Sequence, residues 1–219
     1  MRVLVACESS GVVRDAFRAL GHNAWSCDLL PSDSPYHLQG DVLQYLTDNW
    51  NMLIAHPPCT YLTSSAEWAY SDGPYHQKVK ADTLTGAARR AARDQAEEFF
   101  MEMANAPIRH ICIENPVGVM STRWRKADQY IQPYDYGSDA SKKTGLWLKN
   151  LPLMVADPAD RISGRLVDGK ERWANQTNSG QNRLPPSANR WQVRSETYSG
   201  IATQMAQQWS NVKQNEHTI

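Results

Sequence analysis

Short apolar runs, separated by polar turns and helical patterns, dominate the first half of the chain. The runs that predict strands cover residues 2–6, 23–27, 52–55 and 108–113. Each is short and mostly apolar, which is typical of strands buried within a sheet. Between the first two runs, apolar residues spaced three and four apart predict a helix over residues 12–20, which Gly21 ends. This order of strand, turn, helix and strand predicts an α/β fold with a mostly parallel sheet.

Further helical patterns are expected to cover the sheet. A long helix with an apolar stripe is predicted from about residue 78 to residue 105. Its Arg89, Arg90 and Arg93 are expected on a solvated face, and a DNA contact is the alternative. An amphipathic helix is predicted to begin near Gly200 and to close the fold. Residues 60–77, directly before the long helix, are aromatic and serine-rich and have no helical or strand period, so they predict a mobile loop or lid.

Residues 152–194 differ in character from the rest of the chain. They are rich in Asp, Pro, Gly, Asn, Ser and Arg and hold few large aromatic residues. This composition predicts an irregular insertion rather than a second hydrophobic core. The expected organisation is a core of residues 1–151, a small insertion over 152–194, and a segment 195–219 whose helix returns to the core.

Overall composition narrows the class of protein. Apolar residues make up 41% of the 219 residues and charged residues 21%, as in ordinary soluble domains, and no apolar run is long enough to span a membrane. We therefore expect a cytoplasmic protein with no membrane partner. The four cysteines, Cys7, Cys27, Cys59 and Cys112, form no C-x-x-C pair. They predict reduced thiols, with neither a metal site nor a disulfide framework.

The net charge is zero, but the charge is unevenly distributed. Residues 1–120 carry nine Lys and Arg against 14 Asp and Glu, whereas residues 121–194 carry 13 against seven. A basic segment within a neutral protein can present a surface to phosphate groups. The alternative is a solvated loop region whose charge asymmetry has no function.

Two strand ends carry residues suited to chemistry. The run 52–55 stops at His56-Pro57-Pro58-Cys59, where the prolines cannot continue a strand ladder. A cysteine on such a stiff turn is a candidate nucleophile, although it can also be a small buried residue. The run 108–113 ends at Glu114, which we expect to face the same crevice with a raised pKa suited to proton donation. The alternative is a helix-capping role for this second strand end.

The first turn of the chain suggests a ligand site. Residues 7–11, Cys-Glu-Ser-Ser-Gly, join a predicted strand to a predicted helix, and a helix start of this kind suits an anionic or polar ligand. Asp28 follows the second strand, where α/β folds that bind nucleosides place an acid on the ribose diol. A solvated loop aspartate is the alternative.

These motifs, in this order, resemble the cytosine-C5 DNA methyltransferase family, specifically its short phage-type members. The resemblance covers roughly residues 3–150 and 195–210. It rests on the first loop with Asp28, on Gly40-Asp41-Val42, on Pro57-Pro58-Cys59, on Glu114-Asn115-Pro116 and on Thr197-Tyr198-Ser199-Gly200. The chain departs from the family in the first loop, where Cys7 stands for a phenylalanine and Ser9 for a glycine. The segment 152–194 lies where the family inserts its target-recognition domain.

The resemblance implies a Rossmann-like, class I methyltransferase fold that uses S-adenosylmethionine, has double-stranded DNA as its partner and needs no metal. It implies catalytic roles for Pro58, Cys59, Glu114, Asn115 and Lys142. It implies cofactor contacts from Cys7, Glu8, Ser9, Ser10, Gly11, Asp28, Leu29, Asp41, Val42, Pro57, Ser199 and Gly200. The basic residues expected to contact DNA are Arg123, Lys142, Lys143, Arg161, Arg165, Arg172, Arg183 and Arg190.

The implied chemistry explains these residue types. C5 of cytosine is too weak a nucleophile for direct attack, so the Cys59 thiolate would add to C6 of a base flipped out of the duplex. Glu114 would bond N3 and the exocyclic amine, and Asn115 would position the loop. Three alternatives remain open: amino-group methylation, a related reaction on a nucleotide or with another transferred group, and a non-catalytic DNA-binding protein.

Overall fold

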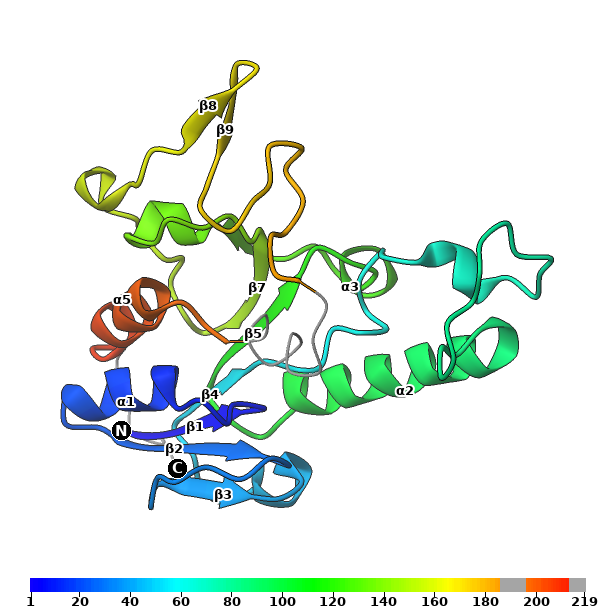
Figure 1. Cartoon of the computed structure of the whole chain (residues 1–219). Coiled ribbons are helices and arrows are strands. Elements are labelled where there is room, and N and C mark those ends of the chain that lie inside the picture. Colours follow the sequence, from blue (N-terminus) through cyan, green and yellow to red (C-terminus); the bar gives the residue numbers. More distant parts are fainter. Residues whose placement is uncertain (186–195, 213–219) are drawn as a thin grey trace.

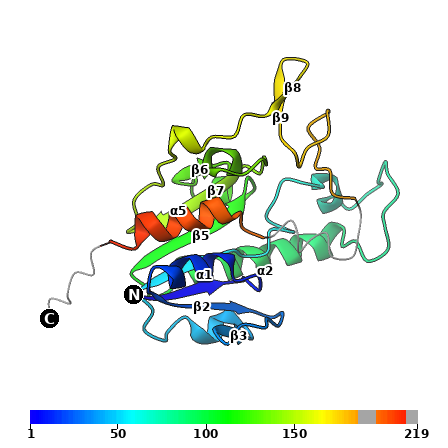
Figure 2. The same ribbon diagram turned by 60° about the vertical axis from the view of Figure 1, so that its left-hand side comes forward.

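Seven strands form one sheet at the centre of the computed structural model, which describes residues 1–185 and 196–212. The sheet order is β3-β2-β1-β4-β5-β7-β6; it can be followed from β3 to β7 in Figure 1, and β6 is labelled in Figure 2. The strands are β1 (Arg2–Ala6), β2 (Asn23–Asp28), β3 (His37–Gln39), β4 (Met52–Ala55), β5 (His110–Pro116), β6 (Gln129–Ile131) and β7 (Thr144–Lys149). The pairs from β3 to β5 are parallel, whereas β7 is antiparallel to both of its neighbours.

The strand order creates a switch point between β1 and β4. The chain winds outward from β1 to β2 and β3, then returns and winds the other way from β4 to β5. In open sheets of this kind, ligands bind beyond the carboxyl ends of the strands that flank the switch. The predicted fold class, a mostly parallel Rossmann-like sheet flanked by helices, is confirmed.

Helices cover both faces of the sheet. The helices α1 (Val12–Ala19) and α5 (Ser199–Trp209) pack side by side on one face, as Figure 2 shows. Phe17 and Trp209 are buried there against strand residues such as Val5 and Ile54. On the other face, α2 (Gly86–Ala104) packs Phe100 against the alternate strand residues. Both faces are apolar because successive strand residues point to opposite sides of a covered sheet.

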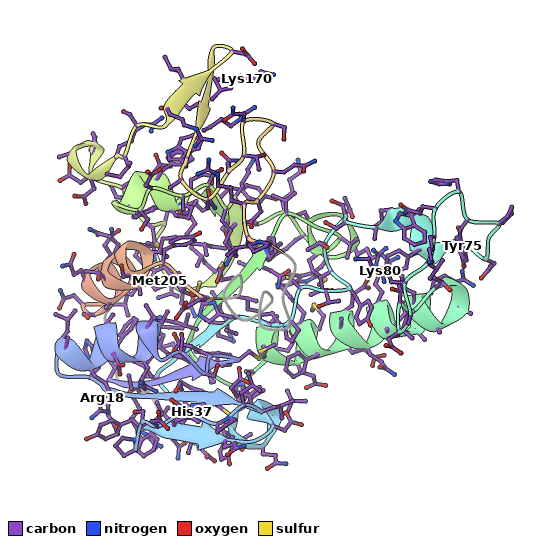
Figure 3. The ribbon with its side chains drawn as sticks, viewed as in Figure 1. Arg18, His37, Tyr75, Lys80, Lys170 and Met205 are labelled. Atoms are coloured by element: carbon purple, nitrogen blue, oxygen red, sulfur yellow. The ribbon has the colours of Figure 1, made fainter. Side chains whose placement is uncertain are left out.

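The remaining elements are short. They are the 3-10 helices η1 (Val42–Tyr45), η2 (Glu67–Tyr70), η3 (Pro133–Tyr136) and η4 (Pro158–Asp160), the helix α3 (Met120–Arg123), and the hairpin of β8 (Arg165–Val167) and β9 (Lys170–Arg172). The hairpin stands away from the sheet, with Lys170 at its outer end (Figure 3). Asp168 and Gly169 both have positive φ at its tip, as a tight two-residue turn requires. The insertion therefore contains a hairpin that its irregular composition did not predict.

Two predicted boundaries are wrong. The long helix begins at Gly86 rather than near residue 78, because residues 78–85 are mostly exposed and gain no packing from a helical turn. The strand predicted over 108–113 does not end at Glu114 but continues through Pro116. Since β4 ends at Ala55, residues 114–116 pair with β7 alone, and a proline without an N–H is tolerated at such an end.

Candidate active site at the carboxyl edge of the sheet

The turn after β4 begins with one more residue of strand pairing. The backbone N–H of His56 donates to the carbonyl of Ala6 at the end of β1, with an N···O distance of 3.0 Å. The prolines then turn the chain away from the sheet. The carbonyl of Cys59 accepts hydrogen bonds from the N–H groups of Leu62 and Thr63 at 3.0 and 3.1 Å, which curls the chain after the half-buried cysteine. Cys59 therefore sits on a fixed turn at the edge of the sheet.

Asn115 links this turn to β5. Its side-chain amide is buried and donates to the carbonyl of Pro57, with a distance of 2.8 Å between Nδ2 and the oxygen. Val119, shortly after β5, donates its N–H to the carbonyl of Leu62 at 2.8 Å. The two strand ends that the sequence singled out are thus joined by hydrogen bonds on both sides of Cys59.

Glu114 forms a close pair with His56. The distance between His56 Nδ1 and Glu114 Oε2 is 2.6 Å, and both side chains are about nine-tenths buried. Burial by itself raises the pKa of Glu114. Lys142, the hydrogen bond and charge of His56, and the Thr144 hydroxyl together outweigh burial and lower this pKa to about 2. The expected raised pKa is therefore wrong, because the partners of this carboxylate stabilise its charge more than burial disfavours it.

The loop after β1 is closed by its own carboxylate. Glu8 is buried, and its two oxygens accept the backbone N–H groups of Val13 (2.8 Å) and Arg14 (3.3 Å) at the start of α1. Burial raises the pKa of Glu8, while the charge of His56 and these two amides act in the opposite direction. A side chain of the loop already occupies these two amides, so they are not open to an anionic ligand. The expectation of an anionic or polar ligand at this turn stays a prediction.

The buried side chain of Arg14 packs against the same loop. The guanidinium of Arg14 lies so close to Gly11 that a Cβ there would come within 2.0 Å of it, and Gly11 has a φ of +78°. Arg14 donates to the hydroxyl of Ser26 at 2.8 Å, and that hydroxyl also bonds His37 on β3. Only glycine satisfies both the space and the backbone angle at this position. The loop is therefore held to β2 and β3.

Acidic residues gather around the end of β1. The pKa of the Cys7 thiol is raised, first by burial and then by the charges of Asp28, Cys27 and Asp41. Burial and the same two aspartates raise the pKa of Cys27 to about 12. One oxygen of Asp28 accepts the N–H of Leu30 at 2.9 Å, so its loop is ordered. Asp28 and Asp41 thus lie on the same side of the sheet as the first loop.

Two other predicted cofactor residues lie at the first turn of α5. Ser199 and Gly200 line a pocket of about 310 Å³ together with Tyr136 of η3 and Asp160 of η4. A Cβ at Gly200 would come within 1.7 Å of the carbonyl of Tyr136, so the helix start packs directly on η3. The other predicted cofactor residues do not line this pocket.

The loop after Cys59 is attached to α2 by arginines. Arg93 donates through Nε to the carbonyl of Tyr61 at 2.9 Å and pairs with Glu67 at 2.6 Å, and its guanidinium lies 3.4 Å from the centre of the Tyr70 ring. Arg89 lies against the same ring at 4.7 Å. The expected solvated face is wrong for both arginines, which are buried because the loop folds over them. Tyr75, labelled in Figure 3, lies further along this loop.

The arginines expected to contact DNA make intramolecular bonds. Arg161 pairs with Glu171 at 2.7 Å. Arg165 donates to the carbonyls of Trp173 and Gln176 at 2.8 and 2.7 Å. Arg172 donates to the carbonyl of Asn178 at 3.1 Å. These three residues therefore help to fold the insertion.

Three of the other basic residues expected to contact DNA lie in the described part of the chain at separate places. Arg123 pairs with Glu97 at 2.7 Å, Lys143 lies 4.9 Å from the ring centre of Tyr130, and Arg183 is exposed. Arg190 lies outside the described residues. A role in DNA binding stays a prediction for all eight residues.

Within residues 1–185 and 196–212, no cluster of His, Cys, Asp and Glu could hold a metal ion. No helix in the same part of the chain is long and apolar enough to cross a membrane.

Comparison with known proteins adds little to this geometry. No protein-family profile matches the chain, and no curated protein matches it in sequence. One solved structure from E. coli, a prophage-encoded protein with the provisional name DNA modification methyltransferase, shares 12% identity with a TM-score of 0.41. The match covers 68% of this chain and 46% of that one. Similarity this low does not establish a shared activity.

Sequence reasoning left two features of the site without a role. His56 stands one residue before the Pro-Pro turn, and its pairing with Glu114 depends on a residue 58 positions away. Thr144, at the start of β7, acts on Glu114 only because β7 pairs with β5 in antiparallel register. The one available signal was the position of His56 beside the candidate nucleophile.

Proposed function

We propose that this chain is a DNA cytosine-C5 methyltransferase that uses S-adenosylmethionine. The observation that carries the proposal is the joining of the ends of β4 and β5, next to the sheet's switch point. The Cys59 turn and the Glu114–Asn115 strand are connected by the Asn115–Pro57 hydrogen bond and by the His56–Glu114 pair. A thiol and a carboxylate held on neighbouring strands are the two groups that addition to a cytosine ring requires.

The charges at the carboxyl edge fit the cofactor. S-adenosylmethionine carries a sulfonium and an ammonium group, and when bound it supplies an electrophilic methyl group. Glu8, Asp28 and Asp41 lie around the end of β1, and Glu8 occupies the amides at the start of α1 that would otherwise bind a phosphate. This edge therefore suits a cationic nucleoside better than a phosphate-bearing one.

Named residues would hold the cofactor as the family resemblance implies. Asp28 would bond the ribose diol, and Asp41 with Val42 would contact the adenine. The first loop and Pro57 would flank the methionine part. The Ser199–Gly200 helix start has the least support as a cofactor contact, since the pocket that it lines is formed with η3 and η4 and by none of the other proposed cofactor residues.

The chain's own residues would act on the base in a definite order. Pro58 and the hydrogen bond from Asn115 to Pro57 fix the turn, so that Cys59 can add to C6 of the cytosine. The Glu114 carboxylate, kept ionised beside Lys142, accepts a hydrogen bond from the exocyclic amine. The base must leave the duplex to reach both groups, so base flipping is part of the proposal. The basic segment 121–194 would provide the surface for DNA.

Substitution of the nucleophile tests this function. Bisulfite sequencing of DNA from cells that express the protein should show C5-methylcytosine at a defined site, and Cys59→Ala should abolish it. Calorimetry should show that Cys59→Ala still binds S-adenosylmethionine, because the thiol is not among the proposed cofactor contacts. Full activity of Cys59→Ala would refute the mechanism.

A second candidate keeps this chemistry but changes the substrate to a nucleotide. It is favoured by one observation: Arg161, Arg165 and Arg172 are engaged within the insertion. Mass analysis of modified nucleosides, from digested DNA and from the free nucleotide pool, distinguishes the two substrates. The same analysis identifies an amino-group product or another transferred group. Absence of both cofactor binding and any modified base would favour a non-catalytic DNA-binding protein.

A further inference from the structure

His56 is a buried titratable residue that takes no part in the proposed addition to cytosine. It directly follows β4 and stands three residues before Cys59. Its Nδ1 lies 2.6 Å from Glu114 Oε2, and its side chain is 8% exposed. Its other ring nitrogen, Nε2, is buried and has no hydrogen-bond partner among the described residues. Among the described residues, His56 therefore has one side-chain hydrogen bond, the short one to the Glu114 carboxylate.

The charged groups around His56 come from three separate elements. Glu114 on β5 faces Nδ1. Glu8, in the loop between β1 and α1, is close enough for the charge of His56 to act on it. Lys142, just before β7, acts on Glu114 from another side. His56 thus acts on two carboxylates, and Lys142 acts on one of them. Such an arrangement can hold a proton between His56 and Glu114.

The proposed reaction needs such a proton. When a thiolate adds to C6, the ring electrons move toward N3, and a proton on N3 neutralises the charge that develops there. An ionised glutamate can accept from the exocyclic amine but has no proton to give to N3. The imidazole of His56 can give that proton to Glu114, because Nδ1–H and the carboxylate already lie within hydrogen-bonding distance.

We propose that His56 stores the proton that Glu114 passes to N3 of the target base, an inference that rests on the proposed function. The bond between the Cys59 sulfur and C6 forms, the C5=C6 π electrons become the C4=C5 bond, and the C4=N3 π electrons move onto N3. N3 takes a proton from Glu114 as Glu114 takes one from Nδ1 of the imidazolium, which leaves a neutral imidazole with its proton on Nε2. When the thiolate leaves and the C5 proton is lost to solvent, the proton on N3 returns by the same route. His56 acts through Glu114 and is therefore a positioning residue.

The test follows addition alone, without any cofactor. DNA that carries tritium at C5 of cytosine releases it when the thiolate adds, C5 takes up a solvent proton and the adduct reverses. Release by the full-length protein is measured between about pH 5 and pH 9. The wild type should give a bell-shaped profile, because addition needs both a thiolate and a proton held by the His56–Glu114 pair, and rising pH favours the first and depletes the second.

The matched variant is His56→Asn, which keeps an N–H near the position of Nδ1 but cannot ionise. It should lower the maximal rate by about 100-fold and lose the descending limb of the profile. His56→Ala should behave in the same way, and thermal unfolding shows whether either variant is folded. In a Glu114→Gln background, His56→Asn should have little additional effect, since the path to N3 is already broken.

The outcomes separate this inference from the proposed function. If the wild type releases tritium and folded His56→Asn releases it at a similar rate with the same descending limb, the role of His56 is overturned. The proposed function would still stand in that case. No release by the wild type at any pH, with Cys59 intact, would count against the proposed function and with it this role.

Discussion

Arg93→Ala should loosen the loop that follows the nucleophile without unfolding the core. The side chain is 6% exposed and makes two kinds of contact with that loop: hydrogen bonds to the Tyr61 carbonyl and to Glu67, and a guanidinium placed on the face of Tyr70. Buried hydrogen bonds from a charged donor contribute about 1.5–3 kcal/mol, and a partly desolvated cation–π contact about 1 kcal/mol. We expect the loop to lose about 3 kcal/mol against local opening, which is roughly a 100-fold increase in its open population.

Amide hydrogen exchange of the loop measures this effect. The N–H of Ala69 bonds to the Ala66 carbonyl within η2, between Glu67 and Tyr70, so it should exchange about 100-fold faster in Arg93→Ala, while the N–H groups of β1 and β4 keep their protection. Arg90→Ala is the matched control on the same helix. Arg90 is 46% exposed and pairs with an exposed Asp72, and it should change exchange by only a few-fold. Equal protection in Arg93→Ala and the wild type, or an equal effect of Arg90→Ala, would refute the reasoning.

Three further predictions concern the site and its supports. Asn115→Ala removes the hydrogen bond to the nucleophile turn, so it should slow addition by about tenfold or more. The affinity for S-adenosylmethionine, measured by calorimetry, should be unchanged. Weaker cofactor binding with normal addition would contradict this prediction. Gly200→Ala forces a Cβ onto the Tyr136 carbonyl and should destabilise the protein by about 1–3 kcal/mol in urea unfolding, and an unchanged midpoint would show that α5 can shift freely. The pKa of Glu114 is lowered in the folded protein, so its contribution to stability is present above about pH 4.5 and is lost as pH falls toward 2. The melting temperature of Glu114→Gln should therefore fall less steeply with acid than that of the wild type. Parallel curves of melting temperature against pH would rule the contribution out.

The strands and helices that could be predicted are those whose signal is local. The apolar runs at 2–6 and 52–55 became β1 and β4 because a strand buried on both faces needs nothing but short apolar sequence. The helix over 12–20 was predictable from spacing and from Gly21, which has a φ of +82°. Residues 78–85 have helical spacing but no face to bury, so local pattern alone placed the start of α2 too early.

The site was predictable as a set of residue types but not as a set of charges. The strand ends indicated Cys59 and Glu114, since carboxyl ends of neighbouring parallel strands meet at one edge. The state of Glu114 depends on Lys142, which comes from a segment 28 residues further along the chain and reaches the site only through the antiparallel return of β7. Arg93 was assigned to solvent for the same reason, because its partners belong to a loop about 30 residues earlier.

The two sides of Cys59 are built differently, and this difference bears on how a large substrate could enter. Before the cysteine, the turn is fixed by backbone pairing to β1 and by the amide of Asn115, groups that belong to the sheet itself. After the cysteine, Val119 still holds the chain at Leu62, but the part of the loop that contains Glu67 and Tyr70 is held to α2 by arginine side chains, which can release it without breaking the sheet. Loops held in this way open at lower free energy than the core they cover. Under the proposed function, a flipped base would reach a thiol that stays in place while the loop beside it moves, and the Arg93 experiment measures the free energy of that movement.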